Sequence, residues 1–172
     1  MKNKSLTQKR LREVLSYDPC SGVFIWYDQY GKGKNQSSGS VAGHKNSKGY
    51  LCITVDGNIY KAHRLAWLYM TGEWPKEVID HKDTVKDNNK FDNLREATLS
   101  ENAQNQIKPS RNNKSGRLGV TWDKKQEKWA ATICINGKNR RLGRFHDPDV
   151  AHAAYLAAKA THHPFANIGV SG

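Results

Sequence analysis

The sequence predicts an α+β protein with a β-rich N-terminal scaffold, followed by a small three-stranded antiparallel sheet backed by one helix. Two hairpin signals support it, because Asp56-Gly57 and Asn136-Gly137 each lie between β-rich segments. Residues 108–115 hold Lys, Pro, Ser, Arg and Asn with nothing apolar, which is typical of a linker. We therefore expect domains at 1–107 and 116–172.

The first domain opens with a short basic helix and a run of strands. In chain order we expect a helix over Thr7–Ser16, a strand over Gly22–Tyr27, a loop over Asp28–Lys48, a hairpin over Tyr50–Lys61 and a helix over His63–Thr71. Gly72 follows as the helix stop, with Pro75 just beyond.

A second strand pair is expected around an Asp-His dipeptide. Val78–His81 predicts a short strand, a polar loop leads to a strand over Asn93–Thr98, and Ser100 is expected to cap a helix reaching about residue 107. Neighbouring strand residues point to opposite faces. Asp80 and His81 can therefore serve one site only if the strand ends or bends there.

The C-terminal domain shows three strands and one helix. The strands are expected over Leu118–Trp122, Lys128–Ile135 and Asn139–Phe145, and Asp147 is expected to cap the helix. In that helix one face carries Ala151, Ala154, Tyr155 and Ala158. On the middle strand one face carries Trp129, Ala131, Ile133 and Ile135, and we expect it to pack against the helix. The opposite sheet face, with Thr132, is left for a partner.

Composition limits the class of binding partner. A net charge of +12 and a pI of about 9.7 favour a polyanion, because Lys and Arg release counterions from phosphates. A membrane surface is the alternative, but we find no basic amphipathic helix, lipid signal, signal peptide or long apolar span. The 3 cysteines are scattered, which favours a reducing compartment and no structural zinc. We expect a cytoplasmic protein of a bacterial or phage-infected cell.

The stretch VIDHKDTVKDNNKFDNLREATLSENAQN resembles the HNH endonucleases of the phage and intron homing type, whose motif forms a ββα-metal fold. The similar region spans about residues 62–106, within the domain 1–107. The resemblance implies that His81 is the general base, that Asp80 and Asn102 are metal ligands, and that Asn93 pins the loop holding His81. Asn105 is a possible substitute ligand. Arg64, Lys82 and Arg95 are candidate phosphate contacts, and His63 is expected to be structural.

This residue set suits phosphodiester hydrolysis. A histidine with a near-neutral pKa can take a proton from water. Carboxylate and amide oxygens suit Mg²⁺ or Mn²⁺. No small-molecule cofactor is expected.

Residues 116–172 resemble the apetala-two/ethylene-response-factor DNA-binding domain, through Gly119-Val120, Lys128-Trp129, Leu142-Gly143-Arg144-Phe145 and Asn167. The resemblance implies that the sheet enters the major groove of double-stranded DNA. Arg141 is the best candidate for a base contact. The other candidate DNA contacts are Arg117, Thr121, Lys124, Lys125, Thr132, Lys138 and Asn139.

The leading hypothesis is a metal-dependent, site-preferring DNA endonuclease that nicks as a monomer, with a homodimer on DNA needed for concerted breaks. The alternative is a non-catalytic DNA-binding regulator on a degenerate nuclease fold. RNA cleavage is the third hypothesis, weakened because A-form major grooves are too narrow for a sheet.

Overall fold

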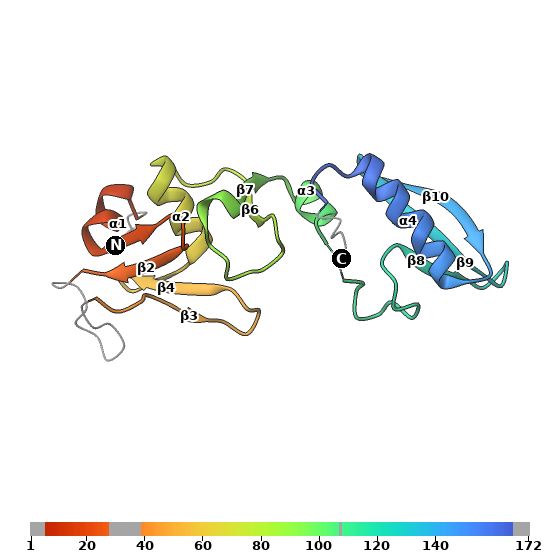
Figure 1. Ribbon diagram of the computed structural model, residues 1–172, viewed down its shortest axis with the longest axis horizontal. Helices are drawn as coiled ribbons and strands as arrows, with labels where there is room; N and C mark the ends of the chain where they lie inside the picture. Colours follow the sequence, from red (N-terminus) through yellow and green to blue (C-terminus); the bar gives the residue numbers. More distant parts are fainter. Residues whose placement is uncertain (1–5, 28–38, 107, 167–172) are drawn as a thin grey trace. The chain divides into compact units, whose positions relative to one another are not determined.

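The structure is a computed structural model, and it describes residues 6–27, 39–106 and 108–166 (Figure 1). The chain forms two compact units, Met1–Ala97 and Thr98–Gly172. The division falls before the helix that was expected to close the nuclease domain at residue 107. The functional boundaries 1–107, 108–115 and 116–172 stay a prediction.

The first unit begins with helix α1 (Gln8–Val14), capped by Thr7, whose side chain accepts a hydrogen bond from the Arg10 backbone. The prediction that this helix continues to Ser16 is wrong. Leu15 starts strand β1 (Leu15–Asp18), which pairs antiparallel with β2 (Val23–Trp26). Leu15 is fully buried opposite Trp26, so tertiary packing overrides local helical periodicity.

A three-stranded sheet follows, in the order β3-β4-β5. The predicted hairpin is confirmed, since β4 (Leu51–Val55) and β5 (Asn58–Lys61) flank Asp56 and Gly57, whose φ angles of 48° and 77° suit a type I′ turn. β3 (His44–Lys45) lies where the sequence predicts a loop. It is too short to show an alternating pattern, and residues 28–38 of that loop lie outside the described part.

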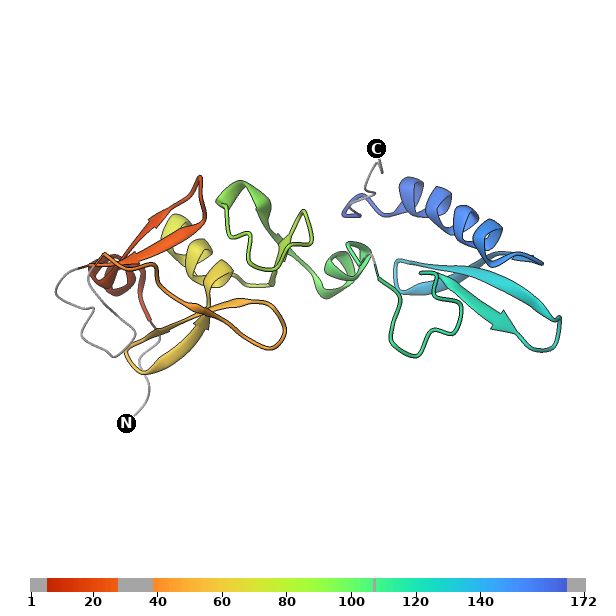
Figure 2. The ribbon, with the colours of Figure 1, turned by 60° about the horizontal axis from the view of Figure 1, so that its bottom comes forward.

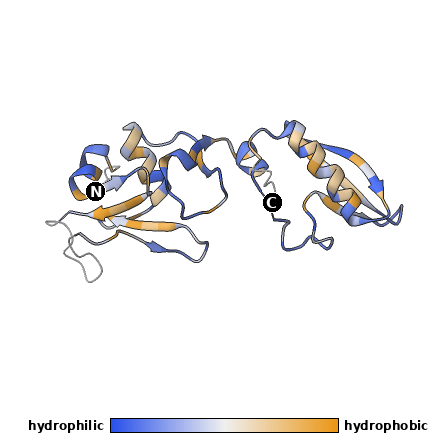
Figure 3. Ribbon diagram, in the orientation of Figure 1, coloured by the Kyte–Doolittle hydropathy of each residue, from blue (hydrophilic) through white to orange (hydrophobic). Residues whose placement is uncertain are grey.

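Helix α2 (Ala62–Thr71) supplies the centre of the first core. Its Leu65, Ala66 and Leu68 pack with Leu11, Phe24 and Ile53. Gly72, with a φ of 85°, ends the helix in the left-handed conformation, as its position predicts. Figure 3 shows hydrophobic colour along β2 and β4, whereas the loop after β6 (Val78–His81) is largely hydrophilic.

The last strand pair of this unit joins β6 (Val78–His81) to β7 (Leu94–Ala97), with His81 opposite Leu94. Asn93 ends the 3-10 turn η1 (Phe91–Asn93) and does not begin the strand. The polar loop between the strands therefore runs directly from His81 to η1.

The second unit begins with α3 (Leu99–Gln104). Ser100 was expected as its N-cap, which is wrong, because Thr98 and Glu101 form a capping box. The helix ends at Gln104, with Asn105 as its C-cap, short of the predicted residue 107. Lys159, at 3% exposure, donates from Nζ to the Gln106 carbonyl oxygen at 2.7 Å.

The predicted C-terminal sheet and helix are confirmed. β8 (Val120–Asp123), β9 (Lys128–Ile135) and β10 (Lys138–Phe145) form an antiparallel sheet with β9 in the centre, and α4 (Pro148–His162) lies along one face (Figures 1 and 2). Ala151 and Tyr155 are buried on α4, as its periodicity predicts.

The segment 108–115 forms no helix or strand, but its end is anchored. Ser115 Oγ donates to the Val120 carbonyl oxygen at 2.9 Å, and Asn113 Nδ2 reaches the same oxygen at 3.2 Å. Across the described residues, no helix is both long and apolar enough to span a membrane.

Candidate active site

The dipeptide Asp80-His81 lies at the end of β6, and both side chains are buried, at 6% and 5% exposure. The strand ends at His81, where the chain turns, since the Thr84 backbone N–H donates to the His81 carbonyl oxygen at 2.9 Å. Because the strand ends at this point, Asp80 and His81 can contribute to the same site, as the sequence requires.

The His81 ring is held by an asparagine. Its Nε2 lies 3.3 Å from the Oδ1 of Asn89, and an amide oxygen can only accept, so Nε2 carries the proton. Asn89 is fixed in turn, because its side-chain Nδ2 donates to the Asp87 backbone carbonyl at 3.2 Å and its backbone carbonyl accepts from the Tyr17 hydroxyl at 2.7 Å. The basic lone pair of the imidazole therefore resides on Nδ1.

Burial dominates the protonation of this histidine. Desolvation lowers the pKa of His81 below its usual value of 6.5, and this outweighs the hydrogen bond that His81 donates to Asn89 and the nearby carboxylates, which raise the pKa. The imidazole is therefore neutral near neutral pH, as a general base must be.

A second histidine packs beside the first. His63, in the first turn of α2, meets His81 edge-on with ring centroids 4.9 Å apart, and Tyr50 lies 5.4 Å from His63. Burial, reinforced by His81, lowers the pKa of His63 to about 3. Its Nδ1 is buried and has no hydrogen-bond partner among the described residues.

Asn93 ties together the loop that follows His81. Its Oδ1 accepts from the Asp83 backbone N–H at 3.1 Å, and its Nδ2 donates to Asp83 Oδ1 at 2.9 Å and to the Asn88 carbonyl at 2.8 Å. The backbone carbonyl of Asn93 accepts from the Lys82 backbone N–H at 2.9 Å. One amide thus bridges both ends of the loop that carries Asn89.

Asp80 is paired with a cation. Arg95, opposite it on β7, donates from Nε and from a terminal nitrogen to Asp80 Oδ2 at 3.0 and 2.8 Å. A buried carboxylate at a strand end is a hard oxygen donor, so Asp80 fits a ligand of Mg²⁺ or Mn²⁺. Within the described ranges no three His, Cys, Asp or Glu side chains gather as a metal cage.

The other predicted ligand lies on α3, in the second unit. Asn102 is exposed there, whereas Asn105 is buried at 4% exposure. The assignment of Asn102, or of Asn105 in its place, stays a prediction.

The candidate phosphate contacts of the first unit have local partners. Arg64 lies with its guanidinium carbon 5.8 Å from the Trp74 ring centroid, and Lys82 donates from Nζ to the Asp92 carbonyl at 2.7 Å. Arg95 is engaged with Asp80. Their contact with DNA stays a prediction.

Asn89, Asp83 and Asn88 are functional residues that the sequence pattern does not distinguish. They lie in the run DTVKDNNK, where no periodic pattern distinguishes one polar residue from another. The one available signal is the pair of adjacent asparagines ahead of Asn93, since amides can bond to a ring and to backbone at once.

In the second unit the register places the predicted contacts on the sheet face away from the helix. Thr121 pairs with Ala130, Arg141 with Thr132 and Asn139 with Cys134, so these side chains share a face. Lys124, Lys125 and Lys138 are exposed in or beside the turns, and Arg117 is paired with Asp149 at 2.5 Å. Arg144 was missed on this face.

Comparisons with known proteins identify the chain's family. Residues 60–104 match the HNH endonuclease family, a range that contains Asp80, His81, Asn93 and Asn102. Protein 3.8 of Escherichia phage T7 is 34% identical over 111 residues, which cover 62% of this chain and 91% of the relative. The chain belongs to the HNH endonuclease family.

A solved structure described as DNA binding and cleavage by the HNH homing endonuclease I-HmuI is also similar. It is 26% identical, with a TM-score of 0.42, and the match covers 54% of this chain. The chain spans about half of that protein, 51% of its length. The similarity of residues 116–172 to apetala-two domains stays a prediction.

Proposed function

We propose that this HNH family member is a metal-dependent, site-preferring DNA endonuclease that hydrolyses phosphodiester bonds, with His81 as general base. The observation that carries the proposal is a buried, neutral imidazole next to a buried carboxylate, oriented by Asn89 so that its lone pair is on Nδ1. Asp80 and Asn102 are the proposed ligands of one divalent cation, Mg²⁺ or Mn²⁺.

The residues of the chain divide the work. His81 Nδ1 takes the proton of the attacking water, and Asn89 keeps the ring from turning. Asn93 fixes the loop that carries Asn89, so its role is positioning. Arg95 holds the Asp80 carboxylate. When bound, the cation would supply positive charge against the phosphate and the leaving oxygen.

The second unit is proposed to bind double-stranded DNA with the open face of the β8–β9–β10 sheet. Thr121, Thr132, Asn139 and Arg141 lie on this face, and the turn lysines lie at its ends, where phosphates are reached. The net charge of +12 supports such a partner. A single centre per chain cuts one strand per encounter, so a monomer is proposed to nick.

The test is cleavage of supercoiled plasmid with Mg²⁺, Mn²⁺ or EDTA. We expect metal-dependent nicking, and a loss of roughly 10²- to 10⁴-fold in His81→Ala, because a general base is removed. His44→Ala is the matched control, since this histidine is exposed on β3. If the wild-type protein and His81→Ala both bind DNA and neither cuts any substrate, the regulator hypothesis would be favoured.

A further inference from the structure

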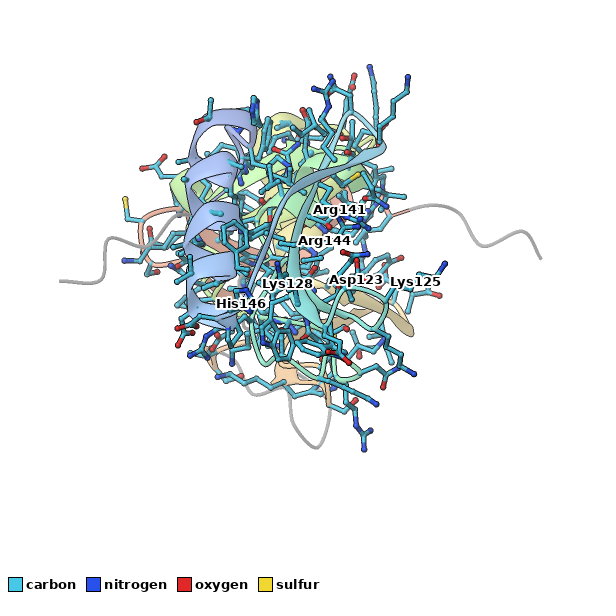
Figure 4. The ribbon with its side chains drawn as sticks, turned by 90° about the vertical axis from the view of Figure 1, so that its right-hand side faces the viewer. Asp123, Lys125, Lys128, Arg141, Arg144 and His146 are labelled. Atoms are coloured by element: carbon cyan, nitrogen blue, oxygen red, sulfur yellow. The ribbon has the colours of Figure 1, made fainter. Side chains whose placement is uncertain are left out.

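The open face of the C-terminal sheet carries one acid between two arginines. We call Asp123, Arg141 and Arg144 the Asp123 cluster, and Figure 4 shows the three side chains close together on the side of the sheet away from α4. Asp123 comes from β8, and both arginines come from β10.

A β-bulge brings the two arginines to the same face. Arg141 pairs with Thr132, but the next pair on β10 is Gly143 with Ala131, so Leu142 is the extra residue. Strict alternation would place Arg141 and Arg144 on opposite faces. With the shift, Arg144 pairs with Ala130 and faces the same way as Arg141.

The cluster spans the full width of the sheet. Arg144 Nε donates to Asp123 Oδ2 at 2.8 Å, and an Arg141 terminal nitrogen lies 3.9 Å from the same oxygen. β9 runs between these strands, and neighbouring strands are about 4.8 Å apart. Ala130 of β9 lies between Arg144 and β8 and presents only a methyl group, so the long side chain can cross it.

The acid in turn is fixed by the backbone. The Lys125 N–H donates to Asp123 Oδ1 at 3.1 Å, and the Asp123 side chain is 16% exposed. Its hydrogen bond with Arg144 lowers the pKa of Asp123, which stays ionised at neutral pH. Both oxygens of the carboxylate are therefore engaged, one by the turn and one by the arginine.

This arrangement leaves the terminal nitrogens of the Arg144 guanidinium available to a ligand. Its Nε is bound to Asp123, and its two terminal nitrogens make no hydrogen bond to the described residues. A guanidinium presents its donors in a fixed planar fork, and guanine offers the N7 and O6 acceptors in the major groove. A carboxylate amid the arginines repels phosphates, so this site suits a base edge better than the DNA backbone.

We propose that Arg144, oriented by Asp123, is a guanine-reading residue that gives the second unit its base preference. The inference rests on the proposed binding of duplex DNA by this unit. Arg144 is the contacting residue and Asp123 is the positioning residue. The pair contributes little to stability, because the Arg144 side chain is 37% exposed and ion pairs that reach solvent are weakly stabilising.

The test uses the full chain in EDTA, so that binding is measured without cutting, on a pool of randomised DNA duplexes. Bound duplexes are sequenced for base preference, and affinity for the unselected pool is measured separately. Arg144→Lys keeps the charge and removes the fork, and Asp123→Asn removes the carboxylate. The matched controls are Arg140→Lys, which pairs with Ile133 on the other face, and Asp149→Asn, which breaks the Arg117 ion pair.

Wild-type protein should enrich guanine, and Arg144→Lys should lower the enrichment at one position by roughly tenfold. Asp123→Asn should weaken preference at that same position while raising affinity for the unselected pool. Asp149→Asn should raise affinity without changing the preference, and Arg140→Lys should change neither.

Several results would overturn the inference. If Arg144→Lys leaves the guanine preference intact, Arg144 does not read a base edge and contacts at most phosphate, which lysine also binds. If Asp123→Asn leaves the guanine preference intact, the carboxylate does not position Arg144. A wild-type protein that binds duplexes without base preference also contradicts the proposal. Absence of any duplex binding would instead refute the proposed function of this unit.

Discussion

At the scale of single residues, the site depends on buried imidazoles that must stay neutral. His63 has a pKa of about 3 in the folded protein and an ordinary value of 6.5 when unfolded. As the pH falls below 6.5, the unfolded chain therefore binds a proton that the folded chain does not. His81, whose pKa is also lowered by burial, adds to this effect.

We expect the free energy of unfolding to decrease as the pH falls from about 6.5 toward 3, by at most about 1.4 kcal/mol per pH unit for His63. Urea unfolding at a series of pH values measures the slope. His63→Gln should flatten it, whereas His44→Gln, on exposed β3, should not. An equal slope in His63→Gln would show that this histidine is not the cause.

A second prediction concerns Asn89. Asn89→Ala removes the acceptor that orients His81 Nε2, and we expect plasmid nicking to slow by roughly 10- to 100-fold, as with other outer partners of functional histidines. Asn89→Asp keeps an acceptor and should restore most of the rate. Thermal melting checks that both variants fold. If the aspartate variant is as slow as the alanine variant while folded, orientation of the ring is not what Asn89 supplies.

Some functional residues are visible in the sequence and others are not, for physical reasons. The Asp80-His81 dipeptide could be found because a strand and a spaced set of asparagines mark it. Asn89 could not be found in this way. Its importance comes from contacts with His81 and with Tyr17, which is distant in sequence, and Asn89 itself lies in a run of polar residues. Arg144 was missed because the bulge at Leu142 reverses the alternation from which faces are inferred.

At the scale of elements, the second unit depends on close packing of α4 against the sheet. A Cβ on Gly119 would lie 2.1 Å from the Tyr155 ring, whereas nothing lies within 4 Å of one on Gly137, and both glycines have positive φ. Gly119→Ala should destabilise this unit by roughly 1–3 kcal/mol more than Gly137→Ala, which carries the backbone cost alone.

Chemical denaturation of the full chain, followed by the fluorescence of Trp122 and Trp129 in variants lacking the other tryptophans, would measure this difference. Equal destabilisation by the two substitutions would contradict the packing argument. Sequence predicts these strands and this helix well because both obey regular periods. The helical pattern predicts the end of α1 wrongly, because Leu15 belongs to strand β1.

At the scale of the whole molecule, the excess of positive charge governs how the chain meets DNA. With a net charge of +12, the affinity for duplex DNA should fall steeply with salt, by roughly 10³- to 10⁵-fold between about 50 and 200 mM if several phosphates are neutralised. Fluorescence anisotropy in EDTA measures it. A nearly flat dependence would show that few lysines and arginines contact phosphate.

Cleavage products offer a second prediction at this scale. Since one centre is expected per chain, nicked circles should accumulate before linear plasmid at low protein concentration. A gel time course distinguishes the two. Linear product that appears at the same time as nicked circles would indicate paired centres and a dimer on DNA.

The buried Lys159 has a consequence for how such a protein can be recombined. Its ammonium holds the Gln106 carbonyl just after α3, so the helix that bears Asn102 is anchored to the last turns of α4. A chimera that exchanges the C-terminal module at the linker would separate α3 from this anchor. A chimera between relatives that exchanges DNA specificity should therefore transfer α3 and α4 together. Its junction should lie before Thr98 and not after residue 107.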